Sequence, residues 1–238
     1  MRISRLSEID LARLAALTDQ RELEHQLRAY NAGGGAWSYD PVRRSTLDIL
    51  GAATSLFGTL PPVEWPKIAR QIAADCRRGP LQIAANTLVG KILFERARGE
   101  RWLAAEVSMG AMPIGIGETV RYWSNVVLQD AHGPFVPYFD HRREHGIANA
   151  AMRQVVFSMQ HIWVRQRQPD LADVRLAIVR FPSIGTDRST RIDFLREADL
   201  LPYDVLDARV RNVYETWAKV TAEKSRRSGT GGGADELF

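Results

Sequence analysis

The stretch that decides the fold is Glu118-Thr-Val-Arg-Tyr-Trp-Ser-Asn-Val-Val-Leu-Gln-Asp-Ala-His-Gly-Pro-Phe-Val-Pro-Tyr-Phe-Asp140. Two apolar runs flank a short turn built on His-Gly, which is typical of a β-hairpin. Pro134 and Pro137 lie in the second run. Because proline cannot donate a hydrogen bond to a strand ladder, this second strand is expected at an edge of the sheet or in a distorted form.

Helical patterns lie on both sides of the hairpin. Capping residues, prolines and apolar spacing predict helices at about residues 6–29 (with a break near Thr18-Asp19), 40–57, 66–78, 81–98, 149–168 and 202–223. Short apolar runs predict further strands at 101–109 and 174–181. The order predicts an α/β (α+β) fold, in which a small mixed sheet of three or four strands, with the hairpin, is flanked by helices and preceded by a helical N-terminal layer.

Changes in composition divide the chain into three expected parts. Residues 1–99 form a helical N-terminal region, residues 100–224 an α/β core with the C-terminal helix, and residues 225–238 a flexible Ser/Gly-rich tail. The tail carries Ala234-Asp-Glu-Leu-Phe238, which is similar to short motifs that dock on bacterial sliding clamps but lacks their leading glutamine. We expect either a protein partner that binds through Leu237 and Phe238, or a frayed end.

The composition narrows the class of protein. The chain has 238 residues, of which 45% are apolar and 25% charged, as in ordinary globular proteins. A single cysteine, Cys76, excludes a disulfide framework and a cysteine-rich zinc site, and it favours a reduced, cytoplasmic setting. No apolar run approaches the ~20 residues that span a bilayer, and the first residues lack a signal-peptide core, so no membrane association is expected.

The charge pattern permits a polyanionic partner. The net charge is +4, and only four of the 32 basic residues are lysines. Arginine suits bidentate phosphate contacts, although a coding bias explains the excess equally well. Nine arginines between residues 142 and 191 line either a nucleic-acid face or solvated surfaces: Arg142, Arg143, Arg153, Arg165, Arg167, Arg175, Arg180, Arg188 and Arg191.

Local motifs in residues 86–181 resemble those of a nuclease family. They are Gly90-Lys-Ile-Leu-Phe-Glu95, Ala105-Glu106-Val107, Gly117-Glu118 and Phe139-Asp140-His141-Arg142, followed by Gln154 in the next predicted helix. Together they resemble the RecB/Cas4-like branch of the PD-(D/E)xK nuclease superfamily in a degenerate form. The family's histidine falls near Phe94, and its motif lysine is replaced by Arg142.

The resemblance implies a metal site and a phosphate contact. Glu118 and Asp140, assisted by Glu106, would hold Mg²⁺ or Mn²⁺, which generates the attacking hydroxide. Arg142 would contact the scissile phosphate, but it cannot act as a base because it stays protonated. Gln154 stands where the family commonly has a glutamine.

Three functions are therefore weighed. The first is a metal-dependent phosphodiesterase or nuclease of bacterial or phage origin that acts on DNA. The second is a catalytically inactive nuclease-fold protein that binds DNA or serves as an adaptor. The third is a helical protein–protein interaction module. Whether the chain is an enzyme stays open at this stage, as does its oligomeric state.

Each candidate residue also has a structural interpretation. Asp140 is equally suited to capping a loop, Glu106 to pairing with an arginine, and Glu118 to starting a solvated strand. Asp130 is an alternative first carboxylate or a turn former. His141 and His145 suggest a zinc site with Asp140, but the preceding strand and a following glycine argue against the helix that this spacing needs.

Overall fold

A five-stranded mixed sheet forms the centre of the molecule. The computed structural model describes residues 6–30, 38–52, 54–55, 58–59, 63–115, 119–121, 125–142, 146–184, 187–196 and 200–229. The strand order is β11-β8-β7-β6-β3. These strands are β3 (Leu103–Glu106), β6 (Val126–Asp130), β7 (Gly133–Asp140), β8 (Arg175–Arg180) and β11 (Arg191–Phe194). Strands β7 and β8 run parallel, and the other neighbours are antiparallel.

The predicted fold class is confirmed, but the sheet has more strands than expected. Strand β11 and most strands of three two-stranded ribbons were not predicted, because they are too short to show a clear alternation. The ribbons pair β1 (Thr54–Ser55) with β2 (Gly58–Thr59), β4 (Ala111–Pro113) with β5 (Thr119–Arg121), and β9 (Ser183–Ile184) with β10 (Asp187–Arg188). The exception is β5, which lies in the first apolar run of the predicted hairpin, and β1 falls where a helix was expected.

Strand β7 occupies the centre of the sheet, so its expected edge position is wrong. The register explains how its prolines are tolerated. The pairing of β7 with β6 covers only Gly133 to Phe135, while its pairing with β8 begins at Phe135. Pro134 precedes the β8 ladder and Pro137 follows the end of the β6 ladder. Neither proline therefore removes a hydrogen bond that the sheet would otherwise make.

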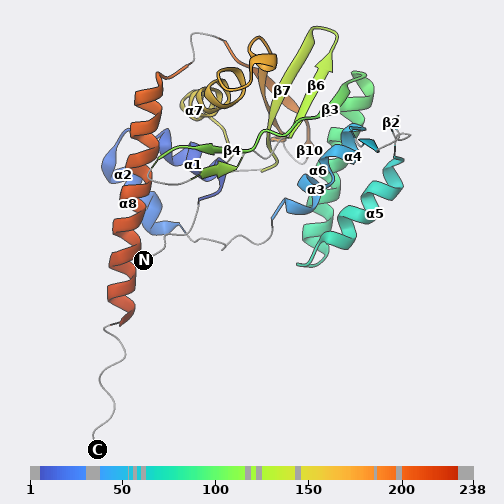
Figure 1. The fold of residues 1–238 in the computed structure, drawn as a ribbon. Helices are drawn as coiled ribbons and strands as arrows, with labels where there is room; N and C mark the ends of the chain where they lie inside the picture. The colour runs from blue at the N-terminus through green and yellow to red at the C-terminus, as the bar shows by residue number, and fades with distance from the viewer. Residues whose placement is uncertain are drawn as a thin grey trace, which may run out of the picture.

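Two layers of helices cover the two faces of the sheet (Figure 1). One layer contains α1 (Glu8–Ala15), α2 (Gln20–Ala29), α7 (Ala150–Gln160) and α8 (Tyr203–Gly229). The other contains α3 (Asp40–Arg44), α4 (Thr46–Leu50), α5 (Trp65–Asp75) and α6 (Pro80–Gly99). A π-helical turn, η1 (His161–Arg165), extends α7, and a 3₁₀ turn, η2 (Pro169–Leu171), precedes β8.

Alternation along β7 divides the hydrophobic core into two clusters. Val136 and Tyr138 pack with α1, α2, α7 and α8, whereas Phe135 and Phe139 pack with α3 to α6. Strand β8 is buried on both faces, which explains its unbroken apolar run. The N-terminal helices are therefore shared between both layers rather than stacked on one side.

Helix ends follow their capping chemistry. The predicted break after α1 is confirmed, because the Asp19 side chain accepts a hydrogen bond from the Glu22 N–H at 2.9 Å and starts α2. The predicted helix at 40–57 is wrong beyond Leu50, where Gly51 adopts a left-handed φ of 70°. Helix α8 continues to Gly229, so residues 225–229 are helical; residues 230–238 lie outside the described residues.

Within the part of the chain that the structure describes, no helix is long and apolar enough to cross a membrane.

Close packing at Gly90 gives the first prediction. A Cβ there would lie 2.9 Å from Ile72 Cδ1, 3.2 Å from Trp65 Cη2 and 3.3 Å from Val42 Cγ2. We expect Gly90→Val to lower the free energy of unfolding by about 1–3 kcal/mol, because it overpacks the α5–α6 contact. Gly99→Ala is the control, since nothing lies within 4 Å of the added carbon. Urea unfolding measures both, and a Gly90→Val protein as stable as the wild type would contradict this packing.

Candidate functional site

The carboxyl ends of the parallel strands form the edge where the sequence places its strongest candidates. Asp140 ends β7 and pairs in register with Arg180, which ends β8. In sheets with parallel strands, ligand sites commonly lie beyond this edge. The structure shows what each polar side chain there contacts.

Asp140 is enclosed by the loop that follows it. Its side chain is 2% exposed, with Oδ1 accepting from the Arg142 N–H at 3.2 Å and Oδ2 from the Ile147 N–H at 2.6 Å. A Cβ at Gly146 would lie 2.1 Å from Oδ2, so the loop leaves no room for another atom on that side. Burial raises the pKa of Asp140, against the lowering effect of the two N–H groups and of nearby arginines. Asp140 therefore caps a loop.

Arg142 is held by the first helix of the chain. Its guanidinium donates to Asp10 Oδ1 at 2.6 Å and to Oδ2 at 2.9 Å, and also to Ser7 Oγ at 3.1 Å. The Tyr30 hydroxyl donates to Asp10 Oδ2 at 3.3 Å. Burial opposes ionisation of Asp10, yet the hydrogen bonds and charge of Arg142 hold its pKa below the usual value. Burial and the Asp10 charge raise the pKa of Tyr30 to about 12.

His141 lies within an aromatic cage. Its ring stacks on Phe181 at a centroid distance of 5.6 Å and on Tyr39 at 6.1 Å. Burial lowers its pKa well below 6.5, and the charges of Arg43 and Arg188 add to this effect. His141 is 2% exposed, and its two ring nitrogens have no hydrogen-bond partner among the described residues. The ring is therefore a neutral core group. The second residue of the suggested zinc pair, His145, lies outside the described residues.

The other predicted ligands do not join Asp140 in the described structure. Glu106 is exposed and lies on β3, opposite Val126 of β6. Strand β6 stands between β3 and β7, so the axes of β3 and β7 are roughly 10 Å apart. Gln154 is half-buried on α7, and Glu118 lies outside the described residues. Asp130 forms an ion pair with Arg175 and accepts from the His132 N–H at 2.8 Å, as a turn former does.

No group of three or more His, Cys, Asp or Glu side chains that could hold a metal ion occurs among the residues that the structure describes. Binding of Mg²⁺ or Mn²⁺ stays a prediction.

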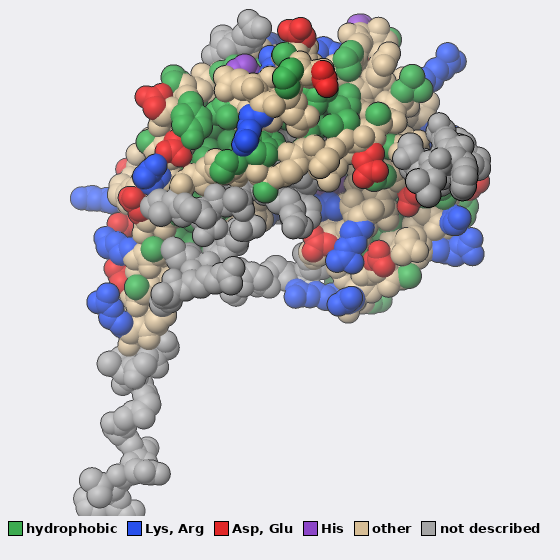
Figure 2. All heavy atoms as spheres, viewed as in Figure 1, with side chains coloured by type: hydrophobic (Ala, Val, Ile, Leu, Met, Phe, Trp, Pro, Cys, Tyr) green, Lys and Arg blue, Asp and Glu red, His purple; other side chains and the backbone are tan. Residues whose placement is uncertain are grey.

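The nine arginines between residues 142 and 191 mostly contact the protein itself. Eight of the nine lie in the described ranges, and each contacts a carboxylate, a carbonyl or an aromatic ring: Arg142, Arg153, Arg165, Arg167, Arg175, Arg180, Arg188 and Arg191. On the face seen in Figure 2, basic and acidic side chains are interspersed. The sequence around Ser7 and Asp10 has the pattern of a helix N-cap, but nothing in it indicates that Arg142, 132 residues from Asp10, is their partner.

The Asp10–Arg142 pair gives a second prediction. Arg142→Met removes the bidentate partner of a carboxylate that is 7% exposed and leaves it only Arg13, at 3.3 Å, as a counter-ion. We expect the free energy of unfolding to fall by about 3 kcal/mol. Asp10→Asn should lower the free energy of unfolding by less than Arg142→Met does. The double variant should lower it by less than the sum of the two single decreases. Urea unfolding of the four proteins forms the cycle. Additive effects would show that the two side chains do not interact as described.

Acid stability gives a third prediction. Because the pKa of folded Asp10 lies below its unfolded value, its contribution is present above about pH 4 and is lost as the pH falls through the folded pKa. The stability difference between wild type and Asp10→Asn should therefore shrink on acidification below pH ~4. Urea midpoints between neutral and acidic pH measure it. Asp140→Asn is the comparison. Because the pKa of folded Asp140 is raised, acidification should increase the stability of the wild type relative to Asp140→Asn. A pH-independent Asp10→Asn difference would refute the pairing.

Comparison with known proteins decides the family. A family model described as "Sliding clamp-binding bacterial toxin SocB" matches residues 9–227. The chain is 32% identical over 237 residues to the DNA replication inhibitor toxin SocB of Caulobacter vibrioides (strain NA1000 / CB15N), and the alignment covers 98% of each chain. No solved structure matches the chain.

These matches overturn the resemblance to RecB/Cas4-like PD-(D/E)xK nucleases. The prediction of a metal-dependent nuclease that acts on DNA is wrong as the main interpretation, and the alternative of a protein without nuclease activity that works by binding agrees better. The physical reason is visible at the β7 edge, where the residues that imitate the nuclease motif cap a loop and hold α1. The chain belongs to the SocB family of sliding clamp-binding bacterial toxins.

Proposed function

We propose that this protein is a toxin that inhibits bacterial DNA replication by binding the sliding clamp. The observation that carries the proposal is similarity along the whole chain, 32% over 98% of both sequences, to a protein named as a DNA replication inhibitor toxin. The packing at the β7 edge supports a binding role, because Asp140 and Arg142 are already engaged by main-chain amides and by Asp10.

A Leu-Phe pair is the feature through which the chain resembles clamp-docking motifs. The sequence contains three such pairs, at residues 56–57, 93–94 and 237–238. The pair in α6 is not available, because Leu93 is 0% exposed and Phe94 packs on Trp65 at a centroid distance of 5.6 Å. The other two pairs lie outside the described residues.

The family match covers residues 9–227 and so includes the pair at 56–57 but not the pair at 237–238. We assign docking to the pair at 237–238 from its setting in the sequence, and a variant at 56–57 tests that choice. The pair at 237–238 follows Asp235 and Glu236, and a run of glycines at 231–233 separates it from α8. A glycine-rich tether gives a short peptide reach while the folded body stays fixed. Helix α8 ends at the periphery of the molecule, away from the sheet (Figure 1).

The chemistry of docking follows from apolar burial. Two side chains of this size each contribute about 1.5–3 kcal/mol when fully buried, less the cost of ordering the peptide. A peptide seated in a docking site of the clamp excludes other proteins that use that site, and the attached body adds bulk. Inhibition by this route needs no bond to be broken in DNA.

Affinity for the clamp of the host bacterium tests the segment. We expect the Leu237→Ala/Phe238→Ala variant to bind the clamp about 100-fold more weakly than the wild type, because two buried side chains are truncated. Fluorescence anisotropy with labelled clamp measures the dissociation constant. Asp235→Asn is the matched control in the same segment and should change affinity by less than about threefold, since a single charge pair in contact with water contributes little.

A Leu56→Ala/Phe57→Ala variant separates the two segments. If it alone loses affinity, the clamp docks at residues 56–57 and the assignment of the tail is wrong. If wild-type protein shows no affinity for the clamp, the proposed function itself is wrong.

A further inference from the structure

Helix α6 presents an apolar stripe on its outer side as well as on its inner side. The inner stripe contains Val89, Leu93 and Ala97, each at most 5% exposed. The outer stripe consists of Leu81, Ala84, Ala85 and Leu88. Leu81 is 70% exposed and Leu88 is 44% exposed. A helix that is apolar on two sides normally has a neighbour on both.

The spacing of the outer stripe suits a second helix. Positions 81, 84, 85 and 88 recur at the i, i+3, i+4 and i+7 intervals of one helix face. Two alanines in the middle let another helix approach closely, while Leu81 and Leu88 supply the side chains that pack on it. Exposed leucines are ordinary when isolated, but a contiguous row on one face marks an interaction site.

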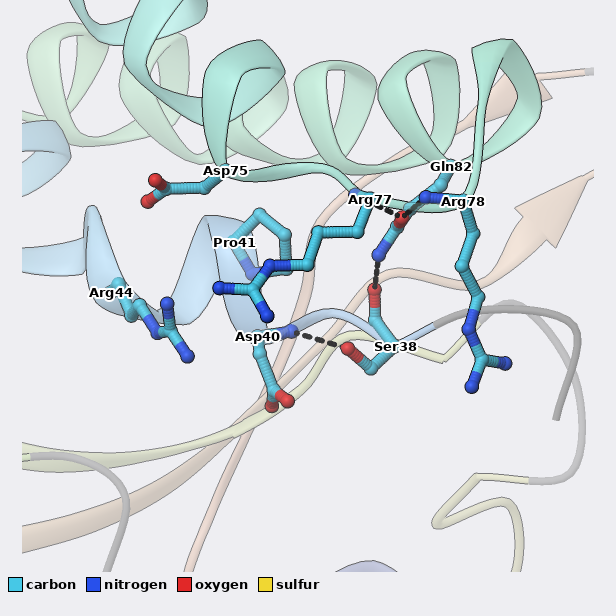
Figure 3. A pocket seen from close by; sticks show the side chains of 8 residues that line it. All are labelled: Ser38, Asp40, Pro41, Arg44, Asp75, Arg77, Arg78 and Gln82. Carbon is cyan, nitrogen blue, oxygen red and sulfur yellow. Dashed lines mark hydrogen bonds between the residues drawn. The ribbon is translucent and has the colours of Figure 1, made fainter. Parts of the chain in front are cut away.

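A polar pocket lies at the N-terminal end of α6, where the stripe begins with Leu81 (Figure 3). Its lining residues are Ser38, Asp40, Pro41, Arg44, Asp75, Arg77, Arg78 and Gln82. The amide of Gln82, which is 4% exposed, organises the pocket: Oε1 accepts from the N–H groups of Arg77 at 3.0 Å and Arg78 at 2.8 Å, and Nε2 donates to the Ser38 carbonyl at 3.3 Å. The backbone that carries these arginines is therefore fixed relative to α3.

The pocket has unmatched positive charge. Of its two carboxylates, Asp40 pairs with Arg43 at 3.6 Å, and Asp75 accepts a hydrogen bond from Gln71 at 3.3 Å. The guanidinium groups of Arg44 and Arg77 make no hydrogen bond or ion pair among the described residues. Figure 3 shows both side chains extending into the pocket with Asp40 near them. The guanidinium groups of Arg44 and Arg77 can therefore pair with carboxylates of another molecule.

We propose that the outer stripe of α6 and this pocket form one docking surface for an acidic amphipathic α-helix of a partner protein. The apolar side of that helix packs on Leu81, Ala84 and Leu88, and carboxylates at its end beside the pocket pair with Arg44 and Arg77. Helix-on-helix recognition of this kind places anchors at i, i+3, i+4 and i+7. A second copy of the chain suits the surface less well, since it brings the same excess of arginine.

This surface is separate from the proposed clamp-binding segment, and it does not depend on the clamp proposal. Figure 1 places α5 and α6 on the right of the molecule and α8 on the left. A chain truncated after Gly229 should therefore retain the helix-binding surface in full.

The test uses three synthetic helical peptides of about 18 residues, long enough to hold a helix. The first carries leucines on one face and glutamates in one terminal turn. The second has the same composition in scrambled order, and the third has lysines in place of the glutamates. Anisotropy with the full chain should show binding of the first peptide, and binding at least about tenfold weaker for the other two.

Variants locate the binding. Arg44→Ala/Arg77→Ala and Leu81→Ser/Leu88→Ser should each weaken binding of the acidic peptide about tenfold, and the arginine variant should also flatten its salt dependence. Arg21→Ala on α2 and Tyr203→Ser on α8 are exposed controls on the other helical layer and should bind as the wild type does. Because all these side chains are exposed or partly exposed, circular dichroism should show unchanged folding.

Hydrogen exchange completes the test. Protection by the acidic peptide should map to residues 77–92. Protection elsewhere, equal binding of the three peptides, or no binding of the first would overturn the proposal. Sedimentation that shows self-association of the chain, abolished by Leu81→Ser/Leu88→Ser, would overturn it in favour of a second copy as the occupant.

Discussion

The bidentate pair between Arg142 and Asp10 is the contact on which the arrangement of the structure depends. Arg142 follows the central strand β7, and Asp10 lies in the first helix, so this contact ties the start of the chain to the end of the central strand, beside the apolar packing of α1 on Val136 and Tyr138. The pair is largely shielded from water, with Asp10 7% exposed. Removing one partner of such a pair is strongly destabilising, because it leaves a buried charge poorly compensated, so the folded state requires both side chains together.

The same edge shows how far local sequence can be misleading. An apolar strand that ends in Asp140 and is followed by Arg142 satisfies a short nuclease motif. In the structure the Asp140 carboxylate caps the 146–147 turn. The Arg142 guanidinium pairs with Asp10, which lies 132 residues away in α1. A short motif contains no information on distant partners, so the capping interpretation of Asp140 and the metal-ligand interpretation were indistinguishable until the tertiary contacts were known.

Much of the fold was accessible from the sequence because it depends on local rules. Ser7, Asp19 and Asn149 start helices by accepting backbone hydrogen bonds, and apolar periodicity located α5, α6, α7 and most of α8. The position of β7 was not accessible. Its prolines argued for an edge, and only the staggered ladders with β6 and β8 reveal that their missing N–H groups are not needed. Likewise, nothing local distinguishes the exposed Leu81 from the buried Leu93.

Folding and function thus rest on different parts of the chain. A double-layered body stabilises one conformation by burying both faces of its sheet, while its binding properties are assigned to a short Leu-Phe segment and to the outer face of α6. The family is defined along the whole length of the chain rather than at one catalytic cluster. This separation agrees with a toxin that acts by occupying a partner.

Clamp-dependent primer extension in the presence of Mg²⁺ tests the central claim most directly, because it distinguishes a clamp-binding inhibitor from a nuclease in one reaction. The account predicts that the wild-type chain arrests synthesis by a clamp-dependent polymerase, that excess clamp relieves the arrest, and that the template stays intact. Template cleavage, or equal arrest of a polymerase that works without a clamp, would contradict it.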